Sequence, residues 1–434
     1  MTEASRDHAD LAGWPAAAVV TGLLLTLLVP GAVLALLHVN YDTPSGAAWE
    51  KVHPGSDLLL LGCAGAVCRE GRPGARLADW ARRFPGSVAF LMITGFLAFY
   101  LITVLRAPFT PLIDTFVVPV AALVAVVELS PAWKARLEAA IHLFVAGNGL
   151  LGIGEFLSGW RLVPAAVAGV EQTAAIESRA FGLLGHPLAS AGMAGLYATV
   201  LMCGGGRRLP ARLRGPALAL QFLALGAFGG RTALVMTAVC AVAAAGVGLL
   251  RVLAGRPVDL RHVALGLLLA PGLLAAAAAV GTSGFFDNVL NRFTDDNGSA
   301  AARHAIFDLF GYLSWPDLLY GPDQDHLASV QHLVGIEVGV ESFWLGFILA
   351  YGLLPSLVFF AGYGLFLADT MRRCTAAAWG PLLFFTGTVS TAISLSAKTT
   401  MLAQFVAMLV ILMPRATVAR SARRPAAALV PALP

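Results

Sequence analysis

Charged side chains are scarce in this sequence. Only 12% of its 434 residues are Asp, Glu, Lys or Arg, whereas 58% are hydrophobic. A soluble globular protein has about a quarter of its residues charged, which covers its surface with groups that water solvates. The composition therefore excludes a soluble globule and indicates a protein that crosses the lipid bilayer several times.

Cysteine is also rare, and the motifs of several enzyme classes are missing. The five cysteines lie in or beside apolar segments and form neither a disulfide framework nor a paired metal spacing. The sequence has no GxxxxGK[ST] loop, no dinucleotide fingerprint and no Cys/His cluster with zinc spacing. Asp295 and Asp296 adjoin Asn297-Gly298, which favours a solvated turn over a metal site. We therefore expect no cofactor and no metal, and neither ATP-driven nor redox chemistry.

Long apolar runs make up much of the sequence. Runs of about 20 residues without the alternation of a barrel strand predict membrane-spanning helices, because backbone polar groups in lipid must bond to one another. We expect one all-α membrane domain over residues 1–434, with about twelve spans. The first run is too long for a cleavable signal peptide, so it should anchor the chain. The spans are placed at residues 14–38, 56–68, 86–105, 111–129, 137–157, 187–204, 216–229, 232–253, 263–281, 343–368, 377–396 and 401–413.

The basic residues test this arrangement. If the amino terminus is cytoplasmic, most of the 29 lysines and arginines fall in cytoplasmic loops, as the positive-inside rule requires. Both termini are then cytoplasmic. The net charge of +4 follows from this sorting and indicates no nucleic-acid partner. The outer face keeps only Lys51, Arg106, Arg161, Arg179, Arg231, Arg292, Arg303 and Lys398.

Two long loops are expected on this outer face, at residues 158–186 and 282–342. Loops of this length are where binding and catalytic groups concentrate, so function is expected to face outward. The second loop contains AARHAIFDLFGYL, which predicts an amphipathic helix carrying Arg303. The segment SWPDLLYGPDQ follows it, and its prolines and glycine predict a turn region.

Two arginines are expected beside helix amino termini at the outer face. Arg179 precedes His186 and Pro187, and a proline is well placed as the first residue of a helix. Arg231 follows two glycines in AFGGRTALV, and glycines allow a ligand to approach closely. Helix amino termini and guanidinium groups together favour a phosphate site. The alternatives are that Arg179 and Arg303 are solvated loop charges and that Arg231 extends its charge into the membrane interface.

Glu341 and Ser342 stand directly before an apolar helix on the same face. A partly desolvated carboxylate at the mouth of an apolar bundle can accept a proton from a sugar hydroxyl, so Glu341 is a candidate general base. The alternative is that Glu341 caps the helix. Glu155, together with Asn148, is a further candidate for lining a substrate groove. Lys51 either helps to bind an acceptor or lies in an interfacial turn.

In this order, the segments resemble the bacterial O-antigen ligase and Wzy-type polymerase superfamily. The resemblance depends on ESRAFGLLGHPLASAG, AFGGRTALV, AARHAIFDLFGYLSWPDLLYGPD and ESFWLGFILAYGLLP. It implies a GT-C-like architecture in the bacterial inner membrane and a periplasmic active site. There, a glycan would be transferred from undecaprenyl diphosphate with inversion at the anomeric carbon, without a nucleotide sugar or an essential metal. It also implies that Arg179, Arg231 and Arg303 hold the diphosphate.

Three functions are consistent with these patterns. Ligases of the superfamily typically carry His-Asn where this chain has Glu341-Ser342, and exopolysaccharide polymerases more often have an acidic residue there. The resemblance therefore favours a polymerase of exopolysaccharide or O-antigen, with another lipid-linked repeat as acceptor and a chain-length regulator as a further candidate partner. A ligase that transfers the glycan to lipid A–core or to a protein is the alternative. A secondary transporter, with Glu155 and Asp114 as intramembrane acids, is a third possibility, although the sequence shows no internal repeat.

The chemistry of a diphosphate leaving group explains why arginines matter here. The enzyme must stabilise the charge that develops on the bridging oxygen and must position an acceptor hydroxyl. Arginine suits the first task better than lysine, because its planar fork contacts two phosphate oxygens at once. Arg231 and Glu341 are accordingly the candidate catalytic residues.

Overall fold

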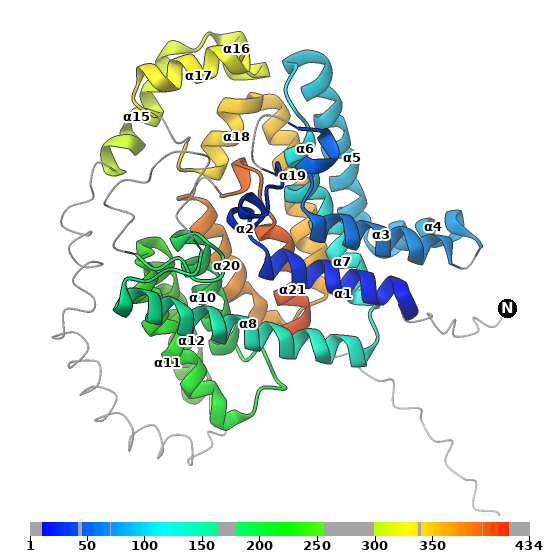
Figure 1. The fold of residues 1–434 in the computed structure, drawn as a ribbon, viewed down its shortest axis with the longest axis vertical. Helices are drawn as coiled ribbons and strands as arrows, with labels where there is room; N and C mark the ends of the chain where they lie inside the picture. The colour runs from blue at the N-terminus through cyan, green and yellow to red at the C-terminus, as the bar shows by residue number, and fades with distance from the viewer. Residues whose placement is uncertain are drawn as a thin grey trace, which may run out of the picture.

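The computed structural model describes an all-helical protein. It describes residues 11–41, 46–69, 71–163, 179–255, 299–336, 340–392 and 394–415, and the side chains of residues 251 and 299–305 lie outside this description. These ranges contain two isolated β-bridges and no strand, so the expected all-α class is confirmed. The helices of eight or more residues are α1 (Gly13–Leu28), α3 (Pro54–Cys68), α4 (Pro73–Arg83), α5 (Pro85–Tyr100), α7 (Val118–Glu128), α8 (Pro131–Ser158), α10 (Pro187–Met202), α11 (Ala211–Phe228), α12 (Arg231–Leu253), α15 (Ser299–Tyr312), α17 (Gln324–Leu333), α18 (Phe343–Tyr351), α19 (Leu353–Arg372), α20 (Trp379–Val389) and α21 (Met401–Leu412) (Figure 1).

Several of these helices are suited to a membrane. Among the described residues, five helical stretches are long and apolar enough to cross a bilayer: Pro85–Leu105, Thr110–Glu128, Pro131–Ser158, Arg231–Leu250 and Leu353–Arg372. Shorter apolar helices accompany them at Gly13–Leu28, Pro54–Cys68, Pro187–Met202, Ala376–Val389 and Met401–Leu412. The span expected at residues 263–281 lies outside the described residues, as do both chain termini.

Two expected spans are interrupted in the structure. The span expected over residues 14–38 ends as α1 at Leu28, and α2 (Gly31–Leu36) begins after Pro30, which lacks the N–H that a continuing helix needs. The span expected over residues 343–368 is divided into α18 and α19 at Gly352. The φ of Gly352 is +84°, a conformation that ends a helix and that glycine adopts without steric cost.

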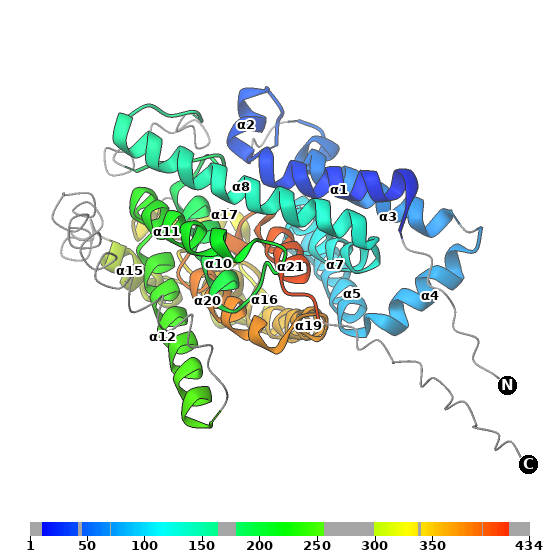
Figure 2. The same cartoon turned by 90° about the horizontal axis from the view of Figure 1, so that it is seen from below.

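The bundle is built around α21, in which every residue from Leu402 to Leu412 is buried. On one side, α1, α3 and α8 run side by side (Figure 2). The first two approach closely because glycines face one another: a Cβ on Gly62 would lie only 2.8 Å from the carbonyl oxygen of Pro15. On the other side, α5 packs against α19 through rings such as Phe90 and Phe366, which stack 5.3 Å apart.

Arginines gather at one end of the bundle. Glu128 at the end of α7 is buried, and it accepts charge-assisted hydrogen bonds from Arg76 at 2.6 Å and from Arg83 at 2.7 Å, both on α4. Arg373 then donates to the carbonyl oxygen of Arg83 at 2.6 Å. These residues belong to loops that the sequence assigns to the cytoplasmic face, and the structure brings them together. We call this the basic end, and we call the opposite end, where α8 finishes and α10 and α12 begin, the outer end.

A small helical layer covers part of the bundle beside α18. It consists of α15, α16 (Trp315–Tyr320) and α17, with a separate apolar core that includes Leu309, Val330 and Leu349 (Figure 1). The sequence predicted a turn region at α16. The structure has a short helix there instead, because Ser314 and Asp317 form a reciprocal capping box that satisfies its first N–H groups.

Candidate functional site

A buried carboxylate positions the loop that carries Arg179. Glu155, in the last turn of α8, is only 3% exposed. Its carboxylate accepts hydrogen bonds from the backbone N–H groups of Leu162 at 3.1 Å, Phe181 at 2.8 Å and Gly182 at 2.8 Å. Bonds of this kind compensate a buried charge, so Glu155 anchors the outer loop.

Asn148, which precedes Glu155 in α8, supports the same loop. Its Oδ1 atom accepts a hydrogen bond from the N–H of Leu183 at 2.7 Å. The hydroxyl of Ser190 on α10 donates to the carbonyl oxygen of Phe181 at 2.7 Å. Gly182 has a φ of +61°, and a Cβ there would lie 2.5 Å from Asn148 Oδ1. The segment GLLGHP therefore needs glycine at this position for its fold.

Arg179 lies against the turn between α11 and α12. A Cβ built on Gly229 would lie 3.5 Å from both Cγ and Cδ of Arg179, and the N–H of Ala180 donates to the carbonyl oxygen of Ala227 at 3.1 Å. Gly229 has a φ of +64° and ends α11. Arg231 begins α12 two residues later. The structure thus brings Arg179 and Arg231 to the same turn.

The amino terminus of α12 offers backbone donors beside these arginines. Gly230 occupies the N-cap position and supplies no side-chain acceptor to the first turn. Its own Cβ position is closed, because a methyl group there would overlap the Cβ of Ala191 on α10. The N–H groups of the first turn and the helix dipole therefore add to the positive potential that Arg231 and Arg179 create.

His186 caps α10 in the same corner. Its Nδ1 atom accepts a hydrogen bond from the N–H of Leu188 at 3.2 Å. Burial, and then the positive charge of Arg179, lowers the pKa of His186 to about 4. The ring is therefore neutral at pH 7 and carries its proton on Nε2. The influence of Arg179 on this pKa shows that the two side chains share one electrostatic environment.

The start of α18 carries the other predicted pair. Ser342 is 8% exposed and caps the helix, since its side chain accepts a hydrogen bond from the N–H of Leu345 at 3.4 Å. The alternative in which Glu341 is the cap is therefore wrong. Glu341 precedes the cap and is half-buried.

The end of α20 connects α18 to the arginine turn. Trp344 on α18 donates through Nε1 to the hydroxyl of Ser390 at 2.8 Å. The next residue, Thr391, donates to the hydroxyl of Thr232 at 3.1 Å. Because Thr232 follows Arg231 directly, the start of α18 and the start of α12 meet around one short segment. Glu341 and Ser342 therefore belong to the same end of the bundle as the arginines.

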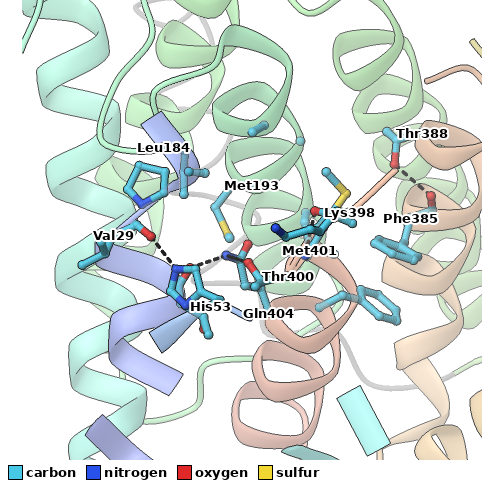
Figure 3. A pocket seen from close by; sticks show the side chains of 18 of the residues that line it. Val29, His53, Leu184, Met193, Phe385, Thr388, Lys398, Thr400, Met401 and Gln404 are labelled. Atoms are coloured by element: carbon cyan, nitrogen blue, oxygen red, sulfur yellow. Dashed lines mark hydrogen bonds between the residues drawn. The ribbon is translucent and has the colours of Figure 1, made fainter. Parts of the chain in front are cut away.

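A cavity of about 180 Å³ opens beside this cluster (Figure 3). Ala189, Gly192, Met193 and Leu196 on α10 line it, and their spacing defines one helix face. Ala191, which meets Gly230, lies on the other side of the same helix. The helix α10 thus separates the cavity from the arginine turn. Further lining residues are Thr26, Val29, Pro30, Gly31, Tyr41, His53, Leu184, Phe384, Phe385, Thr388, Lys398, Thr399, Thr400, Met401, Gln404 and Phe405.

Lys51 is not brought to this cluster, and the structure does not describe the side chain of Arg303. Lys51 donates to the carbonyl oxygen of Asn40 at 2.6 Å and does not line the cavity, which supports its interpretation as part of an interfacial turn. Arg303 lies in α15, and its side chain is outside the described residues. Gln404 also lines the cavity and was not predicted as a site residue. It could have been found as a polar side chain inside the otherwise apolar run 401–413.

No protein-family model matches the chain, and no curated protein matches it. In the described ranges, no three His, Cys, Asp or Glu side chains come together as a set of metal ligands. The geometry of the outer end and the sequence resemblance therefore remain the two indications of function.

Proposed function

We propose that this protein is a glycosyltransferase of the polysaccharide polymerase type. It transfers a glycan from an undecaprenyl diphosphate carrier to a hydroxyl of another lipid-linked repeat. In this proposal it has about twelve spans in a GT-C-like arrangement in the bacterial inner membrane. Both termini and the basic end are cytoplasmic, and the outer end is periplasmic.

One observation carries the proposal: Arg179 packs on the glycine turn from which Arg231 and the amino terminus of α12 emerge. Two guanidinium groups and the backbone N–H groups of a helix start are a combination that binds phosphate oxygens. The neutral state of His186 suits this role, because its Nε2–H can donate to a phosphate oxygen without titrating near neutral pH. The resemblance to Wzy-type polymerases assigns the diphosphate to the same arginines, with Arg303 as a third.

The proposed reaction is a direct displacement. The acceptor hydroxyl oxygen attacks the anomeric carbon on the face opposite the diphosphate, and the bond from that carbon to the diphosphate oxygen breaks. The electron pair of this bond stays on the phosphate oxygen, where Arg231 and Arg179 stabilise the negative charge. Glu341 accepts the proton of the acceptor hydroxyl. The new glycosidic bond has the inverted configuration.

The buried acids argue against transport as the main function. Transporters commonly place carboxylates that bind ions or protons in their pathway. Here Glu155 is occupied by backbone N–H groups. Asp114 accepts hydrogen bonds from the hydroxyl of Tyr41 at 3.0 Å and from the N–H of His53 at 3.1 Å. Both acids hold the protein fold together, so neither fits a mobile-ion site well.

The test is complementation of a deletion strain with Arg231→Lys. Lysine keeps the charge but loses the fork, so we expect glycan polymerisation to fall by about 10- to 100-fold, since a charge-assisted hydrogen bond contributes about 1.5–3 kcal/mol. Arg106→Lys is the matched control: Arg106 is exposed at the outer end of α5 and contacts none of the site. The measurements are polymer yield, lipid-linked intermediates and protein level.

The intermediates separate the alternatives. Accumulated single repeats on the lipid carrier in the deletion strain support a polymerase, whereas accumulated long chains indicate a ligase. Wild-type polymer from Arg231→Lys at normal protein level would contradict the diphosphate site. A strain without any change in lipid-linked glycans would leave transport as the better explanation.

A further inference from the structure

The cavity beside α10 has a lining that is partly polar and partly apolar. The wall formed by residues 388–404 carries Thr388, Lys398, Thr400 and Gln404, and Thr26, Tyr41 and His53 add further polar groups. The apolar lining consists of aliphatic residues from α10 and of Phe385 and Phe405, whose rings stack 4.1 Å apart. A ligand that fits this cavity needs an apolar face and an edge of hydrogen-bonding groups.

Gln404 directs an acceptor atom toward such a ligand. Its Nε2 atom donates both hydrogens, to the carbonyl oxygen of Thr26 at 2.6 Å and to the hydroxyl of Thr400 at 3.2 Å. The orientation of the amide is thereby fixed, and its oxygen accepts no hydrogen bond from any described residue. A buried amide oxygen is stabilised by a donor, and a sugar hydroxyl is a suitable one.

Lys398 supplies a fixed donor on the same wall. Its ammonium group lies 3.3 Å from the centroid of the Tyr41 ring and donates to the carbonyl oxygen of the same residue. Tyr41 is itself held by Asp114. Figure 3 shows Lys398 among the side chains that line the cavity, with its amine end on the side of Met193 and Gln404. The donor is therefore positioned before any ligand arrives, which lowers the ordering cost of binding.

The volume of the cavity suits a ligand with a single six-membered ring. An apolar cavity of roughly 150 Å³ takes one benzene molecule. The present cavity, at about 180 Å³, accommodates one six-membered ring with its substituents. A pyranose has C–H groups on its faces and hydroxyl groups around its edge, which matches aromatic and aliphatic walls beside an amide oxygen and an ammonium group.

We propose that this cavity binds one pyranose unit of the acceptor glycan. That the bound sugar belongs to the acceptor glycan depends on the proposed function, whereas the pyranose site itself does not. An acyl chain in the cavity would cover the Gln404 oxygen without offering it a hydrogen-bond donor, which is unfavourable. A diphosphate fits poorly as well, because it would meet one cation here and two on the far side of α10.

Gly192 allows the cavity to be filled without disturbing its walls. A Cβ at Gly192 meets no atom within 4 Å, so a leucine side chain there extends into the open space. Gly147, on α8, also has no atom within 4 Å of its Cβ position and does not line the cavity, so Gly147→Leu is the matched control. Both substitutions replace a helical glycine and add the same apolar volume.

The experiment is saturation-transfer NMR on the full-length protein in lipid nanodiscs, because maltoside detergents are themselves sugars. The probes are the methyl glycosides of glucose, galactose, mannose, N-acetylglucosamine and glucuronic acid. We expect transfer to at least one probe with the wild-type protein and with Gly147→Leu. We expect a reduction of about tenfold or more with Gly192→Leu. Gly192→Ala, which removes less space, should give a smaller loss.

Absence of transfer to every probe, or equal transfer in Gly192→Leu and the wild type, would overturn the inference. Binding by Arg231→Lys separates this result from the proposed function, because that substitution lies on the other side of α10. If the deletion strain shows no change in lipid-linked glycans yet the probes bind at the cavity, the sugar site stands and the polymerase assignment falls. If the deletion strain accumulates single repeats and the probes do not bind, the assignment stands and the sugar site falls.

Discussion

Glu155 and Asp114 illustrate how a polar side chain in an apolar bundle acquires its role. Each is buried, and each accepts hydrogen bonds from protein donors that fix a loop at the outer end. His53 is similar: its Nδ1 accepts from the N–H of Gly55, and its Nε2 donates to the carbonyl oxygen of Val29. Groups whose hydrogen-bonding capacity is used in this way position the backbone. In the proposed function, the chemistry falls to the arginines that this backbone presents.

His186 gives a pH-dependent prediction. Its folded pKa of about 4 lies below the unfolded value of about 6.5, so the unfolded state binds the extra proton between these values. Stability is therefore lost as the pH falls from 7 to 5, by roughly 1–2 kcal/mol from this group. His186→Asn keeps an N-cap acceptor for α10 but cannot titrate.

The measurement is the midpoint of thermal unfolding in nanodiscs at pH 7 and pH 5. We expect the wild-type midpoint to drop more than that of His186→Asn over this interval. Equal drops in the two proteins would show that Arg179 and burial do not hold the histidine neutral.

The glycine turn between α11 and α12 determines how these helices meet α10. Gly230 has no room for a Cβ because Ala191 occupies that space. We predict that Gly230→Ala separates the turn from α10, costs about 1–3 kcal/mol of stability and displaces Arg231, so that polymer yield falls as well. Gly215→Ala in α11 is the control, because a Cβ there meets nothing and alanine favours a helix.

Thermal unfolding midpoints and polymer yield of the two variants check this prediction. An unchanged midpoint for Gly230→Ala would mean that the turn can move without cost. An equal decrease in the unfolding midpoint of Gly215→Ala would show that the glycine-to-alanine change within a helix causes the effect, and that the contact with α10 does not.

Apolar runs predicted where most helices lie, because burial in lipid and burial in protein require the same residues. The points at which expected spans are interrupted were harder to predict. Pro30 stands inside an expected span and visibly ends it, yet Gly352 was overlooked, because glycine is tolerated inside membrane helices and its positive φ depends on the neighbouring packing. The helix at Trp315–Tyr320 was overlooked because proline and glycine marked it as a turn, whereas the Ser314 cap makes it a helix.

The site could be predicted in part. Arg179 and Arg231 were expected on one face because charge on the arginine-poor face and adjacent glycines are local signals, and in the structure both lie at one turn. The cavity could not be predicted, since Lys398, Gln404 and Gly192 are separated in sequence and become neighbours only when α21 packs beside α10. The anchoring role of Glu155 likewise depends on a loop fold that no periodicity encodes.

The sorting of charge between the two ends of the bundle predicts its orientation. Cys68 is exposed at the basic end, beside the loop that leads to α4. Trp160 is 59% exposed at the outer end, just after α8. Arginines are retained on the cytoplasmic side during insertion, so Cys68 should face the cytoplasm and position 160 the periplasm.

Labelling with a membrane-impermeant maleimide checks this orientation. One variant keeps Cys68 as its single cysteine, and a second replaces Cys68 with alanine and carries Trp160→Cys. In right-side-out membrane vesicles we expect labelling of position 160 alone, and in inside-out vesicles of Cys68 alone, because a charged reagent cannot cross the hydrocarbon core. Labelling of Cys68 in sealed right-side-out vesicles would mean that the bundle has the opposite orientation in the membrane. The arginine turn would then face the cytoplasm, where a periplasmic polymerase cannot use it.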